Sequence, residues 1–248
     1  MDRSIILEAK EIKKSFLYRN SLSVVLEAVN FYIYDGEFVS ILGSSGCGKS
    51  TFLELLAGVS KPDRGQIQYQ GRDITGRTGY LGYMPQEDLL FPWLNVMQNI
   101  LLPVRVKGRD IPNATKKVDE LLPLFGLEHH AKHHPHQLSG GLKQRVALLR
   151  TYMTGSTLLL LDEPYASLDS LTRSQLQDWL KSIVRELKLT IILVTHDIEE
   201  AILLSDRIEL MCKNPGSFTQ SIPIPLNIGA DELAKQALKT DIKAHFCS

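Results

Sequence analysis

The first part of the chain alternates apolar and polar positions in a way that predicts β-strands. Residues 4–12 and 24–34 carry alternating β-branched, aromatic and polar side chains, and residues 66–69 repeat the pattern before the turn pair Gln70-Gly71. A period of two is typical of strands with one buried face. We therefore expect the chain to open with antiparallel β-structure.

Two later segments have a different pattern, because they are short and apolar without interruption. Residues 37–42 and 158–161 are of this kind, and helical spacing follows each of them, at 49–56 and 171–187. Such runs are typical of strands buried on both faces of a sheet that helices cover. Three more elements are expected: a buried strand at 190–195, a short helix at 198–204 and a final strand at 208–212. The fold class is therefore α/β.

The middle of the chain has little strand pattern. Residues 87–154 contain helical patterns at 114–125 and 142–153 together with several prolines. We interpret this stretch as a helical subdomain inserted into one domain that spans 1–248. The expected divisions are a core of residues 1–86 and 155–225, the helical subdomain at 87–154, and a loosely patterned tail at 226–248.

Composition limits the classes of function. The 28 basic residues balance the 28 acidic ones, so nucleic acid is not an expected partner. The three cysteines contain no Cys-x-x-Cys pair, which favours a reducing compartment. The apolar runs are shorter than the roughly 20 residues of a membrane-spanning helix. Any membrane association is expected to come through a partner.

The strongest local motif is GSSGCGKS at residues 43–50, between a predicted buried strand and a predicted helix. It satisfies the pattern G-x-x-x-x-G-K-[ST], in which glycines let backbone N–H groups approach phosphate oxygens. Lys49 is expected to hold the β- and γ-phosphates, and Ser50 to supply an oxygen to Mg²⁺. The complete candidate nucleotide-binding set is Phe16, Gly43, Ser44, Ser45, Gly46, Cys47, Gly48, Lys49, Ser50 and Thr51.

An acidic pair follows the second buried strand, in the sequence LLLLDEP at residues 158–164. Asp162 is expected to orient Mg²⁺ through its water shell, and Glu163 to act as the general base on the attacking water. By itself such a pair is more often a solvated strand end. Its combination with the glycine loop favours catalysis.

With these motifs the chain resembles the ATP-binding-cassette ATPases over residues 5–215. LSGGLKQR at 138–145 resembles their signature sequence. Gln86 before it, and Ser167-Leu168-Asp169 and His196 after it, occur in the family's order. The resemblance implies a P-loop NTPase fold with a RecA-like core, an antiparallel β subdomain and an inserted α-helical subdomain. ATP and Mg²⁺ are the implied cofactors.

The resemblance also implies roles for further residues. In a head-to-tail dimer, Leu138, Ser139, Gly140 and Gly141 of one subunit would face the ATP held by the other. His196 would contact the γ-phosphate, and Gln86 would reach both the metal and the water. Asp169 would couple the two subunits. Phe16 matches the position that stacks on adenine, with Tyr18 as an alternative; Ser139 as an ordinary helix N-cap is the plainer interpretation of that residue.

Within the family, residues 85–96 and the later Asn214-Pro215-Gly216 resemble the nitrate, sulfonate and taurine importer group, which includes bicarbonate and pyrimidine-precursor systems. The implied partners are a second ATPase subunit, identical or different, transmembrane permease subunits and, indirectly, a periplasmic or lipid-anchored solute-binding protein. The implied location is the cytoplasmic face of the inner membrane. Residues 89–93 would line the groove that receives a permease helix, or would only pack the helical subdomain.

Five histidines stand close together before the signature-like sequence, at positions 129, 130, 133, 134 and 136. They lack thiolate or carboxylate partners, so a solvated segment is favoured over a metal site.

Rival functions remain at this stage. A non-transport cassette ATPase is the main alternative, and an exporter is a second one. A GTPase or small-molecule kinase would leave the signature-like sequence unexplained, and Glu163 with His196 argues against a regulator without turnover.

Overall fold

The computed structural model describes residues 4–18, 21–166, 168–213, 215–225, 228 and 232–246. The chain divides into two compact units, residues 1–80 with 189–248 and residues 81–188. Each is described by itself. The second unit begins at Leu81, six residues before the start predicted for the helical subdomain, residue 87. It ends at Lys188, 34 residues after the predicted end at 154.

The first unit begins with an antiparallel sheet, as the alternating pattern predicts. Its strands are β1 (Ile5–Tyr18), β2 (Ser21–Tyr34), β4 (Arg64–Tyr69) and β5 (Arg72–Asp73), in the order β2-β1-β4-β5. Leu7, Ile12, Leu26 and Ile33 are fully buried in it. The remaining strands of this unit are β3 (Phe38–Gly43), β8 (Thr190–Thr195), β9 (Arg207–Cys212) and β10 (Ser217–Pro223), in the order β10-β9-β3-β8.

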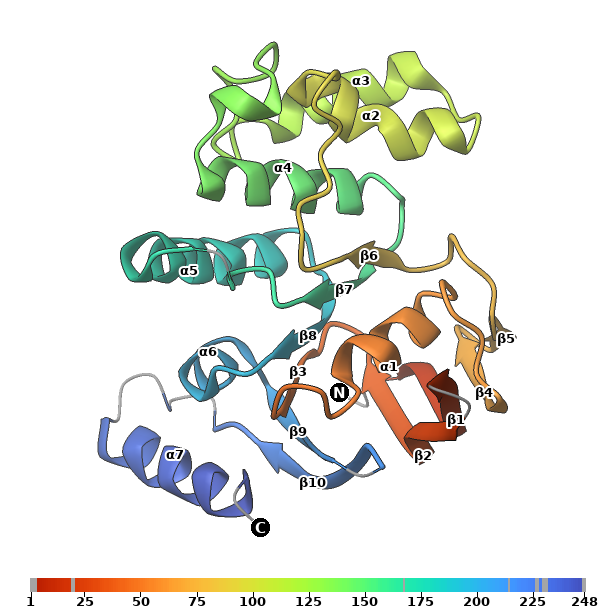
Figure 1. The fold of residues 1–248 in the computed structure, drawn as a ribbon. Coiled ribbons are helices and arrows are strands. Elements are labelled where there is room, and N and C mark those ends of the chain that lie inside the picture. The colour runs from red at the N-terminus through yellow and green to blue at the C-terminus, as the bar shows by residue number, and fades with distance from the viewer. Residues whose placement is uncertain are drawn as a thin grey trace. The chain divides into compact units, whose positions relative to one another are not determined.

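Every residue of β3 and β8 is buried, which confirms both predicted core strands. Their helices are α1 (Lys49–Leu56) and α6 (Ile198–Leu204), with the predicted bounds. The prediction that residues 208–212 form the final strand is wrong, because β10 pairs antiparallel with β9 after Gly216. The tail also contains a helix, α7 (Glu232–Phe246), whose Ile242 is buried in a cluster with Ala201 and Ile202 of α6 (Figure 1).

The second unit combines two parallel strands with helices. β6 (Gly82–Met84) pairs with β7 (Leu158–Asp162), whose residues are all buried. The helices are α2 (Val96–Val106), α3 (Ile111–Leu121), α4 (Gly140–Tyr152) and α5 (Ser170–Glu186), with a short 3₁₀ helix η1 (Pro135–Gln137) before α4. Within this unit α2, α3 and α4 lie together as a helical group (Figure 1).

Two helix predictions need correction. The helical patterns in the sequence do not include residues 96–106, where α2 forms. Pro103 lies inside this helix, although proline disfavours helix interiors. A capping box formed by Asn95 and Gln98 supports its start. The helix predicted at 114–125 is α3, which begins at Ile111 with the side chain of Asp110 as its N-cap and ends at Leu121, before Pro123. Among the described residues, no helix is both long and apolar enough to cross a membrane.

Candidate functional site

The glycine-rich segment is a tight loop between β3, which ends at Gly43, and α1, which begins at Lys49. Gly48 is the N-cap of α1 and has a φ of 106°. A Cβ atom at this position would lie 2.7 Å from Cδ2 of Leu26. Glycine is therefore required here by both the backbone conformation and the neighbouring side chain.

Lys49 directs its ammonium back into this loop. Its Nζ donates to the carbonyl oxygens of Gly43, at 2.8 Å, and of Ser44, at 3.2 Å. The start of α1 has no side-chain cap and no acidic residue in its first turn, so its N–H groups carry an uncompensated partial positive charge. A buried ammonium beside a helix N-terminus suits the phosphates of a nucleotide.

The other predicted loop residues lie where the motif requires. Cys47 is buried, and this burial raises the pKa of its thiol, so the side chain stays neutral and packs as a small apolar group. Ser50, which is exposed, and Thr51 lie in the first turn of α1. The remaining loop positions are Ser44, Ser45 and Gly46, between β3 and α1.

His196 lies at the same edge of the sheet as the glycine-rich loop of residues 43–50. β3 and β8 are parallel, with Leu42 opposite Thr195. Gly43, the last residue of β3, and His196, the residue after β8, therefore lie at the carboxyl ends of neighbouring strands. His196 is exposed, and the residues on either side of it are joined, because the Asp197 N–H donates to Oγ1 of Thr195 at 3.0 Å. Carboxyl edges of this kind are where α/β sheets bind ligands.

Phe16 lies on β1 with 42% of its surface exposed. The Nζ of Lys14 is 5.1 Å from the centre of its ring. The exposed ring face is free to take a flat aromatic group, and the adenine role stays a prediction. The side chain of Tyr18, the alternative, lies outside the described residues.

In the second unit Gln86 and Glu163 also share an edge. β6 and β7 are parallel with Met84 opposite Leu161, and each of the two polar residues follows its strand partner by two positions. Asp162, the last residue of β7, is only 4% exposed. Glu163 has a φ of 43°, a left-handed conformation that costs a non-glycine residue about 1–3 kcal/mol and is typical of functional sites.

The signature-like sequence begins α4. Leu138 is buried, and Oγ of Ser139 accepts the Leu142 N–H at 3.4 Å, so the plain N-cap role is present. Cβ atoms placed on Gly140 and Gly141 would lie 2.9 Å from Leu168 and 3.1 Å from Thr172. The start of α4 therefore packs closely against the residues on either side of Asp169.

Asp169 is the N-cap of α5. Its Oδ1 accepts the Thr172 N–H at 3.0 Å, and hydrogen bonds from Thr172 lower the pKa of the Asp169 carboxyl group. Its carboxylate is exposed, so a dimer contact at this position stays a prediction. Ser167, which precedes it in the motif, lies outside the described residues.

Three groups of predicted residues are thus brought together. The loop and His196 share one edge in the first unit. Gln86 shares another with Asp162 and Glu163 in the second unit. The signature-like residues lie beside Asp169. The convergence of these groups on one nucleotide stays a prediction.

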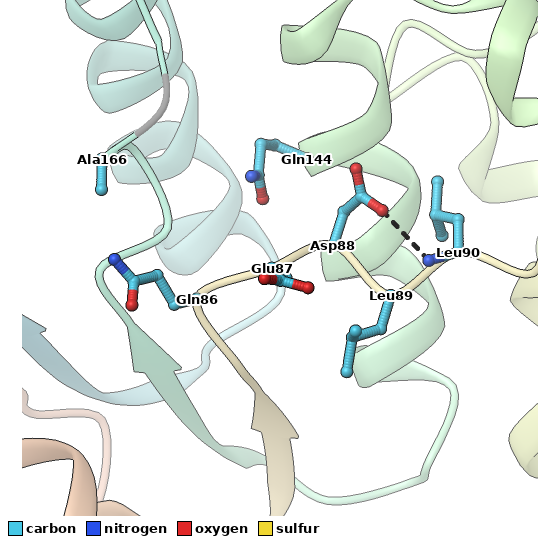
Figure 2. Close-up of a pocket in the computed structure, with 7 residues that line it drawn as sticks. All are labelled: Gln86, Glu87, Asp88, Leu89, Leu90, Gln144 and Ala166. Carbon is cyan, nitrogen blue, oxygen red and sulfur yellow. Dashed lines mark hydrogen bonds between the residues drawn. The ribbon is translucent and has the colours of Figure 1, made fainter.

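A groove of about 710 Å³ adjoins Gln86 and was only partly predicted. It is lined by Gln86, Glu87, Asp88, Leu89, Leu90, Gln144 and Ala166, which Figure 2 shows. Of residues 89–93, which are predicted to line a groove, Leu89 and Leu90 line this one. Oε1 of Gln144 is buried without a hydrogen-bond partner, and the guanidinium of Arg150 donates to the loop backbone. Neither residue was singled out from the sequence, where helical spacing alone marked their helix.

The histidine segment has a structural role. The carbonyl oxygens of His133 and Ala131 accept the N–H groups of Val96 and Met97, the first two residues of α2. Nδ1 of His130 lies 3.0 Å from Nδ1 of His133. In the described part of the chain, no group of three or more His, Cys, Asp or Glu residues is arranged to hold a metal.

Residues 26–166 match the ABC transporter family. The formylaminopyrimidine import ATP-binding protein ThiZ of Halalkalibacterium halodurans is 41% identical over 93% of this chain and 92% of its own length. The aliphatic sulfonates import ATP-binding protein SsuB of Bacillus licheniformis is 43% identical over 86% and 83%. The bicarbonate transport ATP-binding protein CmpC of Synechococcus elongatus is 44% identical over 86% of this chain and 33% of its own.

Solved structures agree with the predicted fold. A dimeric ATP-binding cassette in a post-hydrolysis state, bound to ADP and Pi, has a TM-score of 0.77 and 31% identity, and the alignment covers 89% of this chain and 99% of that one. A second dimeric structure of a bacterial ABC transporter cassette gives the same TM-score at 30% identity and the same coverage. The chain therefore belongs to the ABC transporter family as an ATP-binding, ATP-hydrolysing subunit.

Proposed function

We propose that this chain is the ATPase subunit of an importer for a small solute, of the nitrate, sulfonate, taurine, bicarbonate or pyrimidine-precursor class. The observation that carries the proposal is the arrangement of Lys49 and His196 at one strand edge and of Gln86 and Glu163 at another. ThiZ and SsuB are both import ATP-binding proteins, and this supports the direction of transport.

The chemistry follows from these side chains. Lys49 and the loop N–H groups bind the β- and γ-phosphates, and Phe16 stacks on adenine. Glu163 accepts a proton from the attacking water while His196 holds the γ-phosphate in place. Ser50, Gln86 and Asp162 suit Mg²⁺, which prefers oxygen ligands and keeps several waters, and the ion would neutralise phosphate charge.

We further propose that two subunits, identical or different, bind ATP between them. The start of α4 supports this, because Ser139 and the N–H groups of Gly140 and Gly141 lie at a helix N-terminus that favours an anion. Asp169, beside this helix start, would contact the opposite subunit. ATP favours the closed dimer only by binding it more tightly than the open one, and hydrolysis removes that preference.

The proposed membrane partner is a permease whose helix enters the groove next to Gln86. Leu89, Phe91 and Trp93 are exposed near this groove, which suits an apolar helix face. A solute-binding protein would act on the outer side of that permease. The ATPase subunit would lie at the cytoplasmic face of the inner membrane, where ATP is available.

Capture from membranes tests the proposal. Tagged Glu163→Gln protein is incubated with detergent-solubilised native membranes and MgATP, and the recovered proteins are identified by mass spectrometry. Lys49→Ala is the matched control, since it removes the phosphate contact. A multi-spanning permease that is recovered with Glu163→Gln, and in smaller amount with the control, supports a transport motor, either importer or exporter. A solute-binding protein encoded with that permease identifies the system as an importer.

Recovery of DNA-repair, chromosome or ribosomal factors alone would contradict the importer and support the non-transport alternative. In that case the ATPase chemistry would still hold.

A further inference from the structure

The segment after Gln86 displays apolar side chains on an irregular backbone. Leu89 is 56%, Phe91 37% and Trp93 69% exposed, and the two aromatic rings lie 5.2 Å apart between centres. Three such side chains within five residues form a patch suited to binding another surface. An irregular loop can keep such a patch in place only if side chains elsewhere satisfy its backbone.

Asn99 of α2 holds the second half of this segment. It is fully buried, and its Oδ1 accepts the Phe91 N–H at 2.8 Å. Its Nδ2 lies 3.2 Å from the carbonyl oxygen of Phe91 and 3.0 Å from that of Leu94. This half is therefore fixed to α2.

Arg150 holds the first half. Its two terminal nitrogens donate to the carbonyl oxygens of Asp88, at 2.5 Å, and Leu89, at 2.8 Å. Leu89 has a φ of 44°, which is costly for a residue other than glycine and needs external support. The planar guanidinium of arginine suits this pair of adjacent carbonyls, because it presents several donors in fixed directions.

Arg150 belongs to the helix that begins with the signature-like sequence. α4 is 13 residues long and has Ser139 as its N-cap, so Arg150 lies roughly 15 Å from Gly140 along a single rigid helix. The helix thus has the proposed ATP-facing residues at one end and the partner-facing loop at the other. Burial lowers the pKa of the guanidinium, and the neighbouring Asp88 carboxylate opposes this shift.

We infer that Arg150 is a positioning residue that couples the partner-facing loop of residues 87–95 to the signature end of α4. A helix pressing on Leu89 or Trp93 shifts the carbonyls that Arg150 holds, and α4 carries the shift to Ser139. Coupling is reciprocal, so ATP bound at the signature end changes the loop. This inference rests on the proposed function, because it requires ATP to contact Ser139 across a dimer.

Trp93 offers a direct reporter of the loop. The chain has two tryptophans, Trp93 and Trp179. Trp179→Phe removes the second tryptophan and with it the hydrogen bond from its Nε1 to the Leu124 carbonyl. The parent protein for the experiment carries both Trp179→Phe and Glu163→Gln. Acrylamide quenching of its tryptophan fluorescence reports the exposure of Trp93 alone.

The experiment compares quenching with and without MgATP. We expect MgATP to change the quenching constant in the parent, and Arg150→Gln to remove most of that change, because the loop is then no longer tied to α4. Arg105→Gln is the matched control, an exposed arginine in the last turn of α2, and should keep the full change. The Tm and the affinity for ATP are measured alongside, since a merely structural role would alter these and not the response alone.

Arg150→Lys keeps the cation but loses the planar guanidinium with its fixed donor directions, so an intermediate response is expected. This variant carries the test if Arg150→Gln does not fold. A full response in the folded Arg150 variants overturns the inference. So does a parent that dimerises with MgATP, as seen by size-exclusion chromatography, without any change at Trp93. A parent that binds MgATP without dimerising contradicts the proposed dimer and this inference together, whereas failure to recover a permease concerns the importer alone.

Discussion

The ammonium of Lys49 lies 2.8 Å from the carbonyl oxygen of Gly43, the last residue of β3. The ammonium also donates to the carbonyl oxygen of Ser44, so the cation lies inside the loop between β3 and α1. Phosphate oxygens carry full charge and form stronger hydrogen bonds than carbonyls. The Lys49 ammonium is therefore already in place to bind the phosphates of a nucleotide.

Lys49→Ala should weaken ATP binding by about 10- to 100-fold, the value of a hydrogen bond to a charged group of roughly 1.5–3 kcal/mol. Binding of a fluorescent ATP analogue measures it. Lys116→Ala, an exposed lysine of α3, is the control and should bind as the unmodified protein does. Equal affinity in both variants would contradict the phosphate role.

Glu163→Gln should lower kcat by about 10²- to 10⁴-fold, because the amide cannot accept the proton of the attacking water. ATP binding should persist and a MgATP-dependent dimer should accumulate. Steady-state phosphate release and size-exclusion chromatography measure the two effects. With Glu186→Gln, at the end of α5, turnover should be unchanged; a Glu163→Gln protein with wild-type turnover would eliminate Glu163 as the base.

Asp169 should stabilise the fold in a pH-dependent way. Its pKa is lowered in the folded protein, so its contribution is present above the unfolded pKa of about 3.9 and is lost as pH falls through the folded value. The Tm difference between the protein and Asp169→Ala should therefore shrink below about pH 4. A difference that grows on acidification would contradict this.

Asp169→Asn separates capping from dimer coupling. Asparagine caps helices as well as aspartate does, so the Tm at neutral pH should stay close to that of the unmodified protein. If the carboxylate couples two subunits, the Hill coefficient for ATP hydrolysis should fall in this variant. An unchanged coefficient would leave Asp169 with the capping role only.

Asn99→Ala should be strongly destabilising. It leaves the N–H of Phe91 and the carbonyl of Leu94 without their buried partner, at about 1–3 kcal/mol for each unsatisfied group. Thermal unfolding measures the loss as a lower Tm. Asn113→Ala, at an exposed position of α3, should change the Tm little; equal Tm values would show that the loop does not depend on Asn99.

The elements that were predicted correctly are those whose pattern is local. α1 and β8 have the expected bounds, since an uninterrupted apolar run or a helical period is visible within a few residues. β10 and α7 were missed because their apolar positions make sense only against other elements, such as Ile222 and Ile242 in the cluster around Ala201. α2 contains Pro103, and proline disfavours a helix interior; the capping box at its start supports the helix nevertheless.

The sequence by itself determined the family of this protein and predicted its chemistry, because the glycine loop, the Asp162-Glu163 pair and the signature-like residues are contiguous motifs that are visible without the fold. Only the tertiary structure decided which residues meet across long separations. The parallel pairing of β3 with β8 brings Gly43 and His196 to one edge, and Arg150 reaches Asp88 over 62 positions of chain. Such contacts depend on strand order and helix packing, and neither is encoded in the local period of apolar residues.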